Sequence, residues 1–172
     1  VGGHIVTPMG LSPHMFFEDV FSCSTHESVS KATDLNMLHH HVRGLTTLIH
    51  AFWINGDELS SNEMKDALFG ARDSVNNLIR FCIESINQQY TEDTNLESLP
   101  NKAKQQMLLD QNVHKIIINT LTAPFKPMAW NKHTLKLKDV SLPRHKILNY
   151  ICKRSYKLLT LMVKGNSQFA MQ

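Results

Sequence analysis

The chain lacks the short motifs that report catalysis or nucleotide binding most directly. It contains no GxSxG nucleophile elbow, no phosphate-binding loop and no dinucleotide fingerprint. Its uncharged apolar runs fall well short of the ~20 residues that a membrane-spanning helix needs. Three widely separated cysteines, Cys23, Cys82 and Cys152, form no CxxC pair and no Cys/His set with metal-ligand spacing. We therefore predict a chain that is not an enzyme, binds no metal or cofactor, and keeps reduced thiols in a cytosolic setting.

A strong charge of one sign is also absent. The 172 residues include 18 Lys and Arg against 15 Asp and Glu, and the basic residues are scattered along the chain. Nucleic-acid-binding proteins usually concentrate basic side chains on one face. Four lysines and a tryptophan do lie close together, at Lys126, Trp130, Lys132, Lys136 and Lys138. Such a stretch could touch RNA or a membrane surface, but we expect a solvated loop that docks on a neighbouring domain.

Glycine and proline are few, with 7 and 6 residues, and several of them stand near the start of the chain. Gly2, Gly3, Pro8, Gly10 and Pro13 are followed by a Ser/Thr-rich run, so residues 1–32 are predicted to be an irregular segment. Residues 33–172 are predicted to form a single helical domain. Because residue 1 is Val rather than Met, we expect a fragment of a much larger chain.

Apolar residues make up 42% of the chain and recur at three- and four-residue steps, which indicates amphipathic helices. The predicted helices cover about residues 35–54, 61–89, 102–109, 113–121 and 143–164. Asp34, Ser60 with Glu63, and Asn101 are the expected N-caps. Sharp corners are expected at residues 110–112 and 165–167. Gly70, inside the second helix, is expected to allow the close approach of a neighbouring helix.

No convincing strand remains, although residues 135–140 alternate apolar and polar side chains over a short stretch. The predicted class is therefore all-α, with armadillo-like stacked antiparallel helices from a helical solenoid or bundle. Eight side chains are expected in the core: Leu78, Ile79, Ile116, Ile117, Leu121, Ile151, Leu158 and Leu159.

Two segments carry a resemblance to a known family. Residues 101–125, NKAKQQMLLDQNVHKIIINTLTAPF, resemble a segment of inositol trisphosphate receptors and, more weakly, of ryanodine receptors. Residues 156–168, YKLLTLMVKGNSQ, look like the helix and Gly-Asn corner that close the same domain. With both segments in the right order, residues from about 60 to 172 resemble the homology domain that the two receptor types share.

The resemblance implies a regulatory module in the cytosolic assembly of a tetrameric calcium-release channel at the endoplasmic reticulum. Such modules are armadillo-like, have no chemistry of their own, and carry ligand-driven or calcium-driven motion towards a distant pore. The implied partners are neighbouring domains of the same subunit and adjacent subunits. Contact of this fragment with nucleic acid or with the membrane is not expected.

In the inositol trisphosphate receptors, the first of two copies of this domain contributes basic residues to the ligand site. Lys102 and Lys104 fit that pattern on a short helix that we expect to be solvated, but Gln106 and Leu109 are not basic. A Tyr-Arg-Lys cluster expected after the closing helix is replaced by residues 166–168, Asn-Ser-Gln. A polyphosphate needs several converging cations. We therefore predict no binding of inositol trisphosphate and a better match to the second copy.

Other polar residues are predicted to have no site role. His39, His40 and His41 are adjacent, and adjacent helical side chains point about 100° apart, too far for one ion. Three other histidines, His114, His133 and His145, are isolated in the sequence, and we expect each to be packed or solvated rather than to bind a metal. The acidic pairs at residues 18–19 and 92–93 lack an oxygen-rich calcium loop around them. Cys82 and Cys152 stand on apolar faces and are expected to be buried thiols.

Two other interpretations stay open. The first is a generic armadillo-like scaffold that binds a partner helix or peptide, and the second is a helical nucleic-acid binder. A channel subunit requires apolar spans of about 20 residues downstream, whereas a scaffold does not. A nucleic-acid binder would lose affinity steeply as salt increases.

Overall fold

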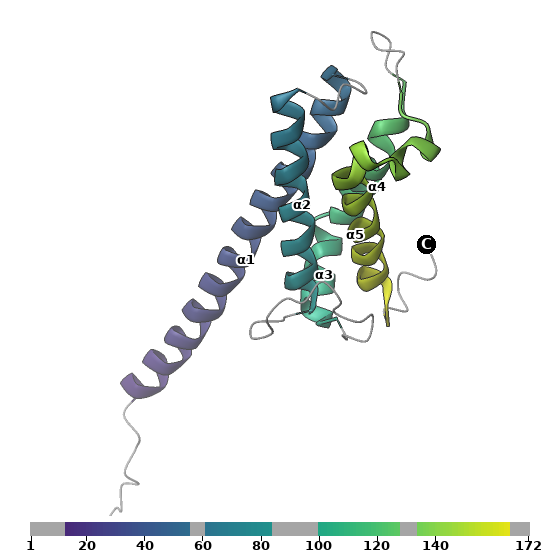
Figure 1. Ribbon diagram of the computed structural model, residues 1–172. Helices are drawn as coiled ribbons and strands as arrows, with labels where there is room; N and C mark the ends of the chain where they lie inside the picture. Colours follow the sequence, from purple (N-terminus) through teal and green to yellow (C-terminus); the bar gives the residue numbers. More distant parts are fainter. Residues whose placement is uncertain (1–12, 56–60, 84–99, 128–133, 166–172) are drawn as a thin grey trace, which may run out of the picture. The chain divides into compact units, whose positions relative to one another are not determined.

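Helices dominate the described part of the computed structural model, which covers residues 13–55, 61–83, 100–127 and 134–165 (Figure 1). These residues form no strand, which confirms the all-α prediction. The chain divides into two compact units, residues 1–37 and 38–172. The buried apolar side chains described below all belong to the second unit.

The first helix, α1, spans Pro13–Asn55 and begins well before the predicted N-cap at Asp34. The predicted irregular segment is therefore wrong over residues 13–32, while residues 1–12 lie outside the described part. Proline at the first helical position has a suitable φ angle and no N–H to satisfy. No glycine or proline then follows until Gly44, so nothing breaks the helix.

The Ser/Thr-rich run that suggested a loop lies inside this helix. Serine and threonine reduce helix stability by only a few tenths of a kcal/mol per residue relative to alanine. Their hydroxyl groups can also bond within the helix. Just after that run, Thr33 Oγ1 donates to the carbonyl oxygen of Val29, at 2.9 Å.

Helix α2 spans Asn62–Ile83 and is approached closely by α1 at Gly44. A Cβ atom added at Gly44 would collide with Ser74 Oγ and lie 3.4 Å from the Gly70 carbonyl oxygen. A Cβ atom at Gly70 would meet nothing within 4 Å. The close approach was therefore predicted for the wrong glycine, because the small residue that it requires stands on the opposite helix.

The N-terminus of α2 is capped one residue later than predicted. Ser61 Oγ accepts a hydrogen bond from Met64 N at 3.2 Å, whereas Ser60 lies outside the described residues. The predicted end of this helix near Gln89 also lies outside them.

Helices α3, Lys102–Asp110, and α4, Val113–Thr122, confirm the predicted corner. The Asn101 side chain accepts from the backbone N–H groups of residues 103 and 104, at 2.9 and 3.1 Å. Asn112 has a left-handed backbone, with φ 54°. Asparagine tolerates this conformation, so the chain can leave α3 and start α4 at once.

Three short 3₁₀ turns follow α4: η1, Ala123–Phe125, η2, Leu137–Ser141, and η3, Pro143–His145. The alternating stretch 135–140 is therefore largely helical turn rather than strand. The His145 ring nitrogen Nδ1 lies 2.6 Å from the Asp139 carbonyl oxygen, which fixes η2 against η3.

Helix α5 spans Lys146–Val163, and Gly165 follows it with φ 72°. Asn149 of α5 donates from Nδ2 to the Val140 carbonyl oxygen at 3.2 Å, which holds η2 against this helix. α2 and α5 lie side by side and run in the same direction, because α3 and α4 lead the chain back between them (Figure 1).

Most, but not all, of the predicted core side chains are buried. The buried ones are Leu78, Ile79, Ile117, Ile151 and Leu158. The half-buried ones are Ile116, Leu121 and Leu159. The inner line of α5 continues from Leu158 to Leu161 and Met162. Tyr156, three residues before Leu159 on the same helix, is 64% exposed, so the buried face of α5 is rotated away from the one that contains Leu159.

Candidate functional site

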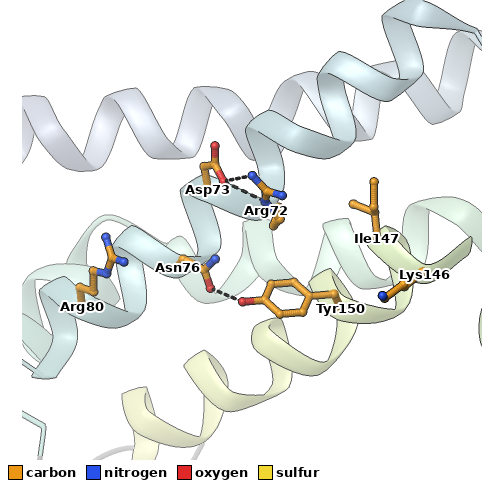
Figure 2. A pocket seen from close by; sticks show the side chains of 7 residues that line it. All are labelled: Arg72, Asp73, Asn76, Arg80, Lys146, Ile147 and Tyr150. Carbon is orange, nitrogen blue, oxygen red and sulfur yellow. Dashed lines mark hydrogen bonds and ion pairs between the residues drawn. The ribbon is translucent and has the colours of Figure 1, made fainter. Parts of the chain in front are cut away.

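A cleft of ≈ 470 Å³ lies between α2 and α5 (Figure 2). α2 contributes Arg72, Asn76 and Arg80 at four-residue steps, and α5 contributes Lys146 and Tyr150 at the same step. Residues four apart on a helix lie above one another on one face. Each helix therefore presents one row of polar side chains to the cleft, and Asp73 and Ile147 complete its lining.

Asn76 joins the two rows at their middle. Its Oδ1 atom accepts hydrogen bonds from Tyr150 OH at 3.3 Å and from Arg154 Nε at 2.9 Å. The Arg154 guanidinium also lies 5.7 Å from the centre of the Tyr150 ring, and the residue is only 8% exposed. Asn76 thus fixes both a phenol and a nearly buried cation on α5.

The charge of the lining is predominantly positive. The lining contains three cations, Arg72, Arg80 and Lys146, and one carboxylate, Asp73, which pairs with Arg72 at 2.9 Å (Figure 2). Burial, and secondly the nearby Arg80, lowers the pKa of Arg154. The contribution of Arg80 means that the positive charge of α2 acts on Arg154, which lies beneath the cleft.

The same effect continues along α5. Burial, and secondly the charge of Arg154, lowers the pKa of Lys157. Burial and neighbouring cations therefore both disfavour further positive charge below the cleft.

The composition of the lining is suited to binding. It holds no serine, cysteine or histidine, and its single carboxylate is engaged by Arg72. Arginine and lysine rows beside a phenol are suited to binding an anionic group.

A second feature is a pair of hydrogen bonds that connects segment 101–125 with segment 156–168, the two segments that resemble the receptor family. Gln105 of α3 is 1% exposed, and its Nε2 atom donates to the carbonyl oxygens of Leu161 at 2.6 Å and Lys164 at 2.9 Å. Carbonyl groups at the end of a helix have no partner within the helix. We call this set of two bonds the Gln105 clasp; it caps the C-terminal end of α5 and fixes α3 against it.

The face of α3 where the resemblance expected cations is not basic. Gln106 Nε2 donates to Asp110 Oδ1 at 2.7 Å, and Leu109 is buried. Lys102 is exposed. Lys104, expected to be solvated, is half-buried, and its Nζ atom lies 4.5 Å from the centre of the Phe81 ring. Lys104 therefore contacts α2, while residues 166–168 lie outside the described part.

The histidines are dispersed. His39 and His40 are exposed, while His41 is buried, and burial and secondly His40 lower the pKa of His41. His114 is half-buried, and burial followed by the charge of Lys115 lowers its pKa. His145 is buried against η2, as described above, and His133 lies outside the described residues. The described residues hold no group of three or more potential metal ligands.

The remaining sequence candidates lie apart from the cleft. Cys82 is buried and Cys152 is half-buried. Burial raises the pKa of the Cys82 thiol to about 11 and also raises that of Cys152. The acidic pair at 18–19 lies on α1, and the pair at 92–93 lies outside the described part. In the basic stretch, Lys126, Lys136 and Lys138 are exposed.

Sequence reasoning missed the cleft. The polar residues at four-residue steps, 72, 76 and 80 on α2 and 146, 150 and 154 on α5, are visible in the sequence. They resemble ordinary solvated helix faces until it is known that α2 and α5 are neighbours. The side-by-side, same-direction packing of these helices is the information that turns two faces into one cleft.

Comparisons with known proteins place this helical unit in a family. Among the described helices, none has both the length and the apolar content that crossing a membrane requires. No curated protein matches the chain. A family model described as the RIH domain matches residues 72–172, more than half of the chain. This range includes both segments of the resemblance and every residue that lines the cleft. The chain therefore belongs to the RIH-domain family, the homology domain of inositol trisphosphate and ryanodine receptor calcium channels.

Proposed function

We propose that the chain is a non-enzymatic regulatory and structural module of an inositol trisphosphate receptor-like calcium-release channel. In this proposal it lies on the cytoplasmic face of the endoplasmic reticulum, within a homotetrameric channel. It contacts neighbouring domains and adjacent subunits, and it passes ligand-driven motion towards the pore. The observation that carries the proposal is the Gln105 clasp, which joins two segments that resemble the receptor family and lie within the matched range.

The clasp supports a role in transmission because it couples two elements that are distant in sequence. Gln105 bonds to two residues that lie 56 and 59 positions later in the chain; its bond to Leu161 is buried and its bond to Lys164 is partly buried. Buried hydrogen bonds are costly to break without replacement. A displacement of the α3–α4 corner is therefore passed to the end of α5, from which the chain continues.

The composition of α3 supports a relay rather than a ligand receptor. The positions that would supply phosphate-binding cations hold a Gln106–Asp110 pair and the buried Leu109. A carboxylate beside a polyphosphate repels it. We accordingly place the ligand site of the channel outside this module.

The test uses the complete reading frame that contains this chain, expressed in cells that lack their own calcium-release receptors. Ligand-evoked release from the endoplasmic reticulum is measured with a luminal calcium indicator. We expect release from the parent channel and a strong loss in Gln105→Leu with tetramer assembly preserved on native gels. Gln106→Leu is the matched control, because Gln106 is exposed and bonds only within its own helix.

Two outcomes would contradict this function. A complete reading frame without apolar spans of about 20 residues could not form a pore. Equal release from the parent and Gln105→Leu channels would show that the clasp has no part in transmission.

A further inference from the structure

We propose that the cleft between α2 and α5 is a docking site for an acidic peptide segment of a partner protein, with two carboxylates that flank one apolar side chain. This inference goes beyond the channel assignment and does not depend on it. It rests on the arrangement of charge and apolar surface along the cleft, taken from residues that the structure describes (Figure 2).

The positive charges are distributed along the cleft rather than gathered at one point. Arg72 and Arg80 are eight residues apart on one helix, a separation of about 12 Å at the rise of an α-helix. Lys146 stands on the opposite wall at the first position of α5. The positive end of the α5 helix dipole adds to the attraction for an anion there.

The middle of the cleft is neutral and partly apolar. Asn76 and Tyr150 are joined by a hydrogen bond, and Ile147 lies on the same wall. An apolar side chain of the ligand can pack on the phenol ring of Tyr150 without displacing a charge. The lining therefore alternates cationic, apolar and cationic along its length.

An extended peptide has the matching period. Its side chains at positions i, i+2 and i+4 lie on one face, and the outer two are about 13 Å apart at 3.3 Å per residue. The sequence acidic–x–apolar–x–acidic consequently places carboxylates near the two arginine positions and the apolar residue between them. This spacing agrees with the ~12 Å that separates Arg72 and Arg80 along α2.

A compact phosphate ligand fits the cleft less well. Phosphate sites converge several donors on one group, whereas these cations are spread along two helices. Asp73 also stands within the lining and would repel a concentrated negative charge. A single carboxylate near Arg72 carries less negative charge than a phosphate group, so Asp73, which is paired with Arg72, repels it less.

The test measures binding of a fluorescein-labelled heptapeptide, SESLSES, to the full 172-residue chain by fluorescence anisotropy at low ionic strength. We expect binding of SESLSES and no binding of SQSLSQS, which has glutamine in place of each glutamate. The peptide SEESLSS has the same composition with the carboxylates adjacent, and it should bind more weakly. Added salt should weaken the binding of SESLSES, since it screens exposed charges.

Substitutions locate the binding site. Arg72→Gln, Arg80→Gln and Lys146→Gln should each weaken binding about three- to fivefold, and together about thirty- to a hundredfold. The matched control removes three other positive charges from exposed positions on other elements, at Lys102, Lys115 and Lys138. This control chain, with glutamine at all three, should bind like the parent.

Amide chemical-shift changes give a readout that does not depend on the variants. SESLSES should shift signals of residues 72–80 and 146–150 in the parent chain. Equal loss of binding in both triple variants, shifts confined to other residues, or no binding of SESLSES would each overturn the proposal. Displacement of the peptide by inorganic pyrophosphate at comparable concentration would also overturn it, in favour of a small polyanion site.

Discussion

Replacing Gln105 with leucine tests the clasp between α3 and α5 directly. Leucine has a similar volume but no amide, so both hydrogen bonds to the end of α5 are lost. The Leu161 carbonyl is left in a buried position, whereas water can reach part of the surroundings of the Lys164 carbonyl. Each buried unsatisfied group costs about 1–3 kcal/mol. We therefore expect the free energy of unfolding to fall by about 2–4 kcal/mol.

The assay is thermal and urea unfolding of the full chain, followed by far-UV circular dichroism. For a chain of this size a loss of 1 kcal/mol lowers Tm by about 2–4 °C, so the expected decrease is about 4–16 °C. Gln106→Leu is the control, and its effect should stay within about 0.5 kcal/mol because the side chain is exposed. Equal Tm values for Gln105→Leu and the parent would refute the reasoning, because the carbonyl groups would then be satisfied without the amide.

The variant Gln105→Glu adds a pH dependence with a definite sign. Its carboxyl group would be buried beside two carbonyl oxygens and the negative end of α5, and both features raise its pKa in the folded state. In the unfolded chain its pKa is about 4.3. The neutral acid can donate one hydrogen bond, so the variant is more stable below about pH 4.3 and loses stability as pH rises towards the folded-state pKa. A pH profile parallel to that of Gln105→Leu would contradict this assignment.

Four further predictions concern the core, the helix contact, the thiols and the ligand. Leu158→Asp should unfold the chain, since Leu158 is fully buried and an unpaired carboxylate there costs several kcal/mol. Leu159→Asp should lower the melting temperature less, because Leu159 is only half-buried, and thermal melting measures both. Gly44→Ala should lower the unfolding free energy by about 1–3 kcal/mol, and Ser74→Ala in the same chain should restore part of it. Cys82, with its pKa of about 11, should react with iodoacetamide at neutral pH only after unfolding. Calorimetry should detect no inositol trisphosphate binding.

Each of these predictions has a contrary result. Equal melting of the two leucine variants would mean that the inner face of α5 is misplaced. A Gly44→Ala chain as stable as the parent would mean that α1 and α2 do not touch at Ser74. Rapid alkylation of Cys82 in the folded chain would contradict its burial. Micromolar inositol trisphosphate binding would require cations that α3 lacks.

Local features of this protein follow from the sequence alone. The Asn101 cap and the left-handed Asn112 corner were predictable because each depends on side chains and backbone within one helical turn. The family was predictable for a related reason. The segments 101–125 and 156–168 keep a recognisable order of caps, apolar residues and a closing glycine, and the matched range 72–172 includes both.

The beginning of α1 was not predicted, because the Ser/Thr-rich run was interpreted as a loop together with the glycines and prolines that precede it. The glycines and prolines stop at Pro13, and the Ser/Thr-rich run after it has only a small helix penalty. The sequence contained this information, since the absence of any breaker between Pro13 and Gly44 was visible.

Contacts between distant segments were decided only by the tertiary structure. The apolar periodicity placed Leu159 in the core, but it cannot distinguish two buried faces of α5 that differ by a rotation of one residue. The burial of Leu158, Leu161 and Met162 reflects the packing of α2 against α5. The bond from Gln105 to the end of α5 is likewise invisible in the sequence, as is the cleft of Figure 2. Helix formation is fixed by neighbours within a turn, whereas helix pairing is fixed by the free energy of burying surfaces that the chain brings together only when it folds.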